Sequence, residues 1–224
     1  KLNSDLIVRV GKTEDILFSM AKECKTSWIF CNRERTAEEA RIQDELENRL
    51  WSIGQEMRYN RGKMLYYTAD LPFPIQHTPD VFTQFRKEVE RIVPVREPLS
   101  KPDRTFNPLS FEFPAGDIPS LEELGHNVDD FAKDPRAVLS FKGGETEGIK
   151  RLQYYLWETD LIKNYKETRN GLLGGDYSSK LSPWLAQGCL SPKLIYHELK
   201  KYEAQRGANE STYWLFFELL WRDF

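Results

Sequence analysis

The chain has 224 residues, of which 40% are hydrophobic and 30% are charged. This balance is typical of a globular protein with a sizeable core, and it excludes a disordered chain. No apolar run reaches the roughly 20 residues that a membrane-spanning helix needs, so no membrane partner is expected.

The net charge of −3 does not by itself indicate a nucleic-acid partner. The charge is unevenly distributed, since Lys150–Arg206 holds ten Lys and Arg against six Asp and Glu. Such a stretch fits either a phosphate-bearing ligand or an ordinary solvated helical surface, and charge alone favours the second.

Cysteine and histidine indicate neither a disulfide framework nor a metal site. Cys24, Cys31 and Cys189 are an odd number without paired spacing, which is typical of a reducing intracellular compartment, an organelle or the nucleus. We expect them to be small, buried apolar residues. The three histidines lie beside no pattern with metal-ligand spacing, so no structural metal is predicted.

The first part of the chain alternates predicted strands and helices. Apolar and β-branched runs predict strands at Asp5–Val10, Ser27–Cys31, Glu56–Tyr59 and Met64–Tyr67. Apolar residues at helical spacing predict one helix that begins near Thr13 and reaches Cys24, and a second that follows a capping box at Thr36–Glu39. This alternation indicates a parallel sheet covered by helices.

Six of the twelve prolines fall between residues 94 and 119. Proline fixes φ and lacks a backbone donor, so residues 94–140 are predicted to be a long extended connector between two domains. A helix at Val81–Val93 precedes it, and the chain after residue 141 is predicted to be helical. The last helix, Ser211–Phe224, is apolar almost all round, as expected inside a larger domain.

The first candidate site is the segment Gly174–Pro183, which combines glycine, serine and lysine. Serine hydroxyls, free backbone N–H groups and one ammonium are suited to surround a phosphate or pyrophosphate. The glycine spacing is neither that of a P-loop nor that of a Rossmann fingerprint. The alternative is an ordinary helix cap by Ser182, like Ser191 before Pro192, and chemistry alone favours the cap.

The second candidate site lies on the last helix, where Glu218, Trp221 and Arg222 share one face. Charge in an apolar helix is costly unless it is paired or used. Either Glu218 and Arg222 form an ion pair, or the three residues line a cavity. The residue types alone do not favour one interpretation over the other. Tyr165 and Arg169, one turn apart, form a third candidate pair, although most such pairs are surface residues.

Together these segments resemble the flavin-binding domain of photolyases and cryptochromes, and the strings Tyr-Ser-Ser-Lys-Leu-Ser-Pro-Trp-Leu-Ala and Trp-Arg-Asp-Phe resemble its DASH branch. The matching segments are Asp5–Asp15, Leu71–Phe73, Pro79–Lys87, Gly116–Gly125, Tyr165–Asn170, Asp176–Pro192 and Asn209–Phe224. The resemblance implies an incomplete α/β parallel-sheet domain at 1–93, Rossmann-like and of the photolyase N-terminal type. It further implies the interdomain connector at 94–140 and the start of an all-α FAD-binding domain at 141–224.

The same resemblance implies roles for single residues. FAD would be bound by Tyr165, Ser178, Ser179, Lys180, Leu181, Ser182, Glu218 and Arg222. Trp221 would stack on a flipped pyrimidine dimer and Glu218 would hydrogen-bond to it, while Arg169 would face the DNA backbone. Some family members carry a folate antenna, methenyltetrahydrofolate, for which Glu38 is the candidate ligand.

The implied activity is the repair of cyclobutane pyrimidine dimers by an electron from light-excited, reduced FAD. Single-stranded DNA is the expected substrate and a monomer the expected state. The alternative is a blue-light photoreceptor without significant repair, although Glu218 and Trp221 favour repair. A flavin-free nucleotide-binding or scaffold protein is the least favoured class.

Two parts of the family's pattern are not in this sequence. One is a first strand followed by an Arg-Asn-Asp-Leu-Arg segment, and the other is the group of residues that face the flavin ring. We therefore expect the 224 residues alone to bind FAD poorly and to repair nothing.

Overall fold

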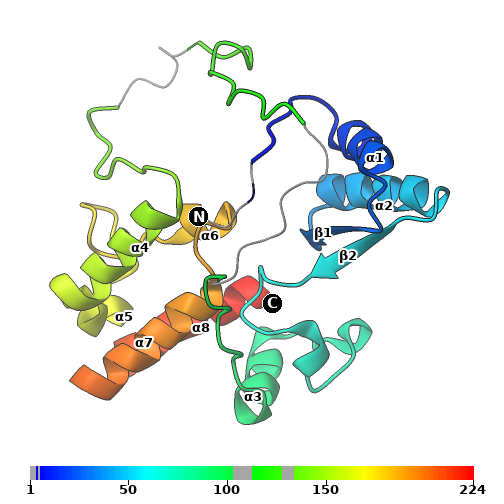
Figure 1. Ribbon diagram of the computed structural model, residues 1–224. Helices are drawn as coiled ribbons and strands as arrows, with labels where there is room; N and C mark the ends of the chain where they lie inside the picture. Colours follow the sequence, from blue (N-terminus) through cyan, green and yellow to red (C-terminus); the bar gives the residue numbers. More distant parts are fainter. Residues whose placement is uncertain (1–3, 5, 103–112, 128–133) are drawn as a thin grey trace. The chain divides into compact units, whose positions relative to one another are not determined.

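The computed structural model describes residues 4, 6–102, 113–127 and 134–224, which form two compact units (Figure 1). One unit draws on Lys1–Asn60 and Ser100–Lys133, and the other on Arg61–Leu99 and Asp134–Phe224. The second unit is thus built from two separate stretches of chain. The predicted domain boundaries, after residues 93 and 140, stay a prediction.

The first unit is a β–α–β arrangement with one more helix. Strands β1 (Trp28–Asn32) and β2 (Glu56–Asn60) pair in parallel, with Trp28 opposite Glu56. Helices α1 (Thr13–Cys24) and α2 (Ala37–Trp51) pack together. The buried core residues are Ala21, Leu46, Leu50 and Met57. The parallel sheet and both helices predicted here are confirmed.

Two predicted strands are wrong. Residues 6–10 form no strand, because the Val8 N–H donates to the Ala115 carbonyl at 2.7 Å and the Arg9 guanidinium bonds the carbonyls of Pro114 and Ala115. Met64–Tyr67 is a bend, because the Leu65 and Tyr66 N–H groups donate to the Asp223 carboxylate. In both places, backbone N–H groups that a strand ladder would need donate instead to a residue that is distant in the sequence.

The second unit is helical. Its elements are η1 (Thr68–Asp70), η2 (Ile75–His77), α3 (Phe82–Ile92), α4 (Glu145–Gln153), the π-helical turn η4 (Tyr154–Glu158), η5 (Leu161–Asn164), α5 (Tyr165–Thr168), α6 (Ser182–Ala186), α7 (Pro192–Arg206) and α8 (Glu210–Asp223). The predicted helices near Val81–Val93, after Glu145 and at Ser211–Phe224 are confirmed. α8 packs against α5 and α7 (Figure 1).

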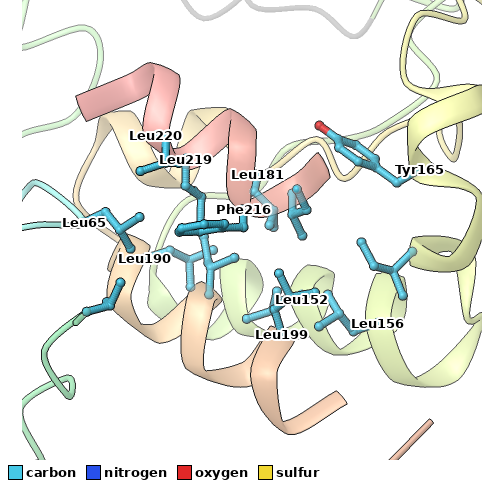
Figure 2. Packing of buried hydrophobic residues seen from close by; sticks show 14 of the residues in the cluster. Leu65, Leu152, Leu156, Tyr165, Leu181, Leu190, Leu199, Phe216, Leu219 and Leu220 are labelled. Carbon is cyan, nitrogen blue, oxygen red and sulfur yellow. The ribbon is translucent and has the colours of Figure 1, made fainter. Parts of the chain in front are cut away.

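One hydrophobic core joins these helices. Figure 2 shows leucines of α4, η4, α7 and α8 converging on one another, with Leu181 beside Phe216. Leu152, Leu156, Leu199 and Leu220 are almost completely buried. Leu65, Phe82 and Val89 belong to the same core, so residues before the connector pack with residues after it.

The two Ser-Pro pairs behave differently. Ser191 caps α7, and its hydroxyl accepts from the Lys193 N–H at 3.2 Å. Ser182 does not cap α6, because the helix starts at Ser182 itself and the preceding residue has helical dihedrals. The predicted cap is therefore confirmed at Ser191 and wrong at Ser182.

The described residues of the connector, 94–102, 113–127 and 134–140, contain no helix or strand, as predicted. Among the helices in the described ranges, none has both the length and the apolar character needed to cross a bilayer. The cysteines in these ranges are free thiols.

Candidate functional site

The loop before α6 is organised by Arg151, a residue of α4 that is only 9% exposed. Its Nε donates to the Ser179 carbonyl at 2.9 Å, and its Nη2 donates to the carbonyls of Gly175 at 2.8 Å and Ser178 at 3.1 Å. Its Nη1 lies 3.2 Å from the Asp176 carboxylate. One guanidinium therefore fixes the course of the backbone from Gly175 to Ser179.

This arrangement leaves backbone donors on the other side of the loop. In a trans peptide the C=O and N–H groups point in opposite directions, and no cis bond occurs in the described ranges. The peptide N–H groups of Ser179 and Lys180 therefore point away from Arg151. Among the described residues they have no acceptor, so they are available to an anion.

Lys180 adopts a left-handed backbone conformation, with φ of 57°. This region is uncommon for residues other than glycine, and it makes the chain turn sharply. The Lys180 ammonium lies 3.6 Å from the centroid of the Tyr177 ring. Ser179 and Leu181 are buried, Ser178 is half-buried and Ser182 is exposed. Leu181 thus anchors the loop in the core, Ser179 is buried with it, and the side chains of Ser178 and Ser182 lie nearer the surface.

The predicted residues of α5 and α8 meet in one cluster. Arg169 Nη1 lies 2.6 Å from Glu218 Oε1, and both side chains are about one-third exposed or less. The Glu218–Arg222 pair considered from the sequence is therefore replaced by an ion pair between two helices. Burial, together with the nearby Glu218 charge, raises the pKa of Tyr165 to about 12, so its hydroxyl remains a donor at neutral pH.

Trp221 presents a partly covered aromatic surface. Its ring stacks on Phe82 of α3, with centroids 3.6 Å apart and an interplanar angle of 14°. The side chain nevertheless remains 47% exposed. A rigid ring that is packed on one side and still accessible is suited to stack on a flat ligand.

Arg222 points to backbone carbonyls. Its Nη1 donates to the Lys63 carbonyl at 2.5 Å, and its Nη2 lies 3.5 Å from the Leu185 carbonyl in α6. Arg222 therefore connects α8 to α6. The segment directly before α6, Gly174–Leu181, is the serine loop. The loop and α8 share one core, since Leu181, Leu219 and Leu220 belong to the same cluster (Figure 2).

Two residues were missed by sequence analysis. Arg151 contacts a loop 24 to 28 residues away, and no spacing rule signals this. Asp223 accepts from the N–H groups of Leu65 and Tyr66 at 2.9 and 2.8 Å. A carboxylate next to Arg222 in an apolar helix was a usable signal, because a buried charge needs partners.

Two further features do not belong to this cluster. Glu38 is an exposed residue in the first turn of α2, in the other compact unit. A cavity of about 410 Å³ lies beside Arg151 and Asp176, but none of the predicted residues Ser178–Ser182 lines it. The loop's free N–H groups therefore belong to a different surface from this cavity.

The chain is similar to proteins of one family. Residues 1–103 match the family model described as DNA photolyase. A cryptochrome DASH of Gloeobacter violaceus is 45% identical over 224 residues, which is all of this chain and 44% of that protein. A relative from Arabidopsis thaliana, named "Cryptochrome DASH, chloroplastic/mitochondrial", is 42% identical over all of this chain and 39% of that protein.

The crystal structure of a Synechocystis sp. PCC6803 cryptochrome matches with a TM-score of 0.88 and 41% identity, over all of this chain and 45% of that one. Over its whole length the chain is therefore similar to members of the cryptochrome/DNA photolyase family. Relatives named cryptochrome DASH, from Gloeobacter, Synechocystis, Xenopus laevis and Arabidopsis, match its whole length, and the chain spans less than half the length of each.

Proposed function

We propose that this chain is part of a flavin-dependent blue-light enzyme that repairs cyclobutane pyrimidine dimers in single-stranded DNA. The observation that supports this most directly is the shared core of the serine loop and α8. A set of unpaired N–H donors suited to a pyrophosphate thereby lies in the same packed unit as Glu218 and Trp221. The family relationship supports the same proposal.

The residues of the loop fit the phosphate part of FAD. Free N–H groups at Ser179 and Lys180, the hydroxyls of Ser178 and Ser182, and the Lys180 ammonium would together surround two phosphates. Tyr165 would donate its hydroxyl to the cofactor. Leu181 and Arg222 would act indirectly, because one anchors the loop in the core and the other holds α6 against α8.

The α8 surface fits the substrate. Trp221 would stack on the extruded dimer, and Glu218 would accept hydrogen bonds from it. Arg169, which now pairs with Glu218, would reach a phosphate of the strand. Extruding a base costs a few kcal/mol and least in single strands, which favours a single-stranded substrate. A folate antenna at Glu38 and a monomeric state complete the proposal.

Bound FAD in its reduced, light-excited form would supply the electron that splits the dimer. The contribution of the chain is to bind and orient. Trp221 and the apolar face of α8 would exclude water from the dimer, and the Glu218 carboxylate would fix its position. The Glu218 carboxylate, which pairs with Arg169, would act as a hydrogen-bond acceptor.

The test uses a protein that contains this chain together with the remaining length of its relatives. Blue light should convert a dimer-bearing single-stranded oligonucleotide to the undamaged form, and darkness should not. Trp221→Ala should weaken dimer binding by about 1–3 kcal/mol, the value of one stacked base. Trp51→Ala, which removes a 72% exposed tryptophan elsewhere, is the matched control and should have no effect.

Equal product in light and darkness would refute light-driven repair. A light-induced spectral change without any repair would favour the photoreceptor alternative. A protein without flavin absorption would refute both.

A further inference from the structure

We propose that Arg151 is the positioning residue that shapes the backbone of Gly175–Ser179 for a pyrophosphate. The inference rests on the proposed function, because it assigns the residue behind the cofactor loop. Nothing in the family comparison assigns Arg151 a role, and it faces the inner side of the loop, opposite the free N–H groups.

The first argument is geometric. Four contacts, to three carbonyls and one carboxylate, engage the guanidinium in different directions. A guanidinium has five N–H donors in a rigid planar fork, whereas a lysine ammonium is a single point on a flexible chain. Lysine at this position would keep the charge, but its three donors are on one nitrogen and could not reproduce four contacts made from three separate nitrogens.

The second argument is the support around Arg151. The Tyr154 hydroxyl donates to the second oxygen of Asp176 at 3.0 Å, so this carboxylate is held from two sides. Gly148, one turn before Arg151, lies so close to α6 that an added Cβ would approach Trp184 and Leu190 to about 3 Å. The close packing of α4 on α6 is what lets Arg151 reach the loop.

The third argument is electrostatic. A carbonyl that accepts from a cation becomes more polarised, and this strengthens the N–H donor at the other end of the same peptide. The N–H groups of Ser179 and Lys180 belong to such peptides. Arg151 therefore acts on a bound pyrophosphate both through the shape of the loop and through the strength of its donors.

The test measures FAD and inorganic pyrophosphate binding in a protein that contains this chain and the remaining length of its relatives. Arg151→Lys and Arg151→Gln should raise the dissociation constant of FAD by about tenfold or more, since preorganisation of the loop is lost. The inhibition constant of pyrophosphate, added as a competitor, should rise by a similar factor. A residue that served only general stability would not shift the two constants in parallel.

Lys150→Gln is the matched control. Lys150 is the neighbouring residue, its side chain is 68% exposed, and within the described part of the chain it forms an ion pair with Glu147 alone. The variant therefore removes one positive charge from α4 without changing a contact of Arg151. It should change either constant by less than about twofold. Thermal unfolding of the flavin-free proteins shows which variants are folded. If Arg151→Gln does not fold, the FAD and pyrophosphate constants are compared for Arg151→Lys and Asp176→Asn instead.

The inference would be wrong if the dissociation constant of FAD for Arg151→Lys lay within about twofold of the value for the unmodified protein. It would also be wrong if the variant bound FAD more weakly while the inhibition constant of pyrophosphate stayed unchanged. If the unmodified protein binds no FAD, the proposed function fails, while direct pyrophosphate titrations followed by tryptophan fluorescence still compare Arg151 with its variants.

Discussion

Asp223 shows how a single buried carboxylate shapes its surroundings. It accepts from two backbone N–H groups, and its neighbour Arg222 donates to the Lys63 carbonyl. Lys193 donates to the Met64 carbonyl at 2.5 Å. Four consecutive residues, 63–66, are thereby held by side chains of α7 and α8. Burial raises the pKa of Asp223 more than the two hydrogen bonds lower it.

The raised pKa makes a prediction about pH. The folded state binds the Asp223 proton more tightly than the unfolded state does, so this group contributes most stability below its ordinary pKa of about 3.9. The contribution is lost as pH rises through the raised value. The free energy of unfolding of the unmodified chain, relative to Asp223→Asn, should therefore fall as pH rises from about 4 towards neutrality.

Urea denaturation at a series of pH values measures this difference. Asp80→Asn, which removes one carboxylate at an exposed position of the same unit, is the control for the substitution itself. A difference between Asp223 and its asparagine variant that stays constant with pH would contradict the prediction.

At the scale of elements, the start of a helix depends on how the chain enters it. Ser191 has an extended backbone, so its hydroxyl can reach the Lys193 N–H. Before α6, Arg151 fixes the loop, and Lys180 turns the chain with a positive φ. As a result, Ser182 is already inside the helix, and its hydroxyl has no hydrogen-bond partner among the residues that the structure describes.

This difference predicts unequal effects of the same substitution. Ser191→Ala should lower the free energy of unfolding by about 1 kcal/mol, because the cap of α7 is lost. Ser182→Ala should change the stability of the flavin-free chain by less than about 0.5 kcal/mol and should weaken FAD binding. Chemical denaturation and FAD titration measure the two effects. Equal losses of stability would show that Ser182 is a cap after all.

At the scale of the whole molecule, sequence patterns predicted what depends on local spacing. A capping box and helical periodicity predicted α2, and a run that is apolar almost all round predicted α8. The role of Ser178–Ser182 around a phosphate stays a prediction. The failures share one physical cause, which is contact between distant residues. Met64–Tyr67 looks like a strand until Asp223, 157 or 158 residues away from its partners, takes its N–H groups. Arg151 was missed because three of its four partners are main-chain carbonyls, which carry no sequence signal, and Asp176 lies 25 residues away.

The length of the chain makes a further prediction. In the proposed function the loop would supply groups for the phosphates, and the chain spans less than half the length of the relatives that it matches. The isolated 224-residue chain should therefore retain far less than one FAD per molecule after gel filtration. Absorbance near the flavin bands measures the ratio, with a longer protein that contains this chain as the positive control. Stoichiometric FAD on the isolated chain would contradict this expectation.

The Arg169–Glu218 ion pair also affects how binding of a nucleic acid would respond to ionic strength. Each basic side chain that neutralises a phosphate of a single strand normally adds about 0.7 to the slope of log affinity against log salt, because a condensed cation is released. Arg169 already has an anionic neighbour, so contact with a phosphate would exchange one counter-charge for another. A salt titration would then register fewer ionic contacts than the number of nearby lysines and arginines suggests.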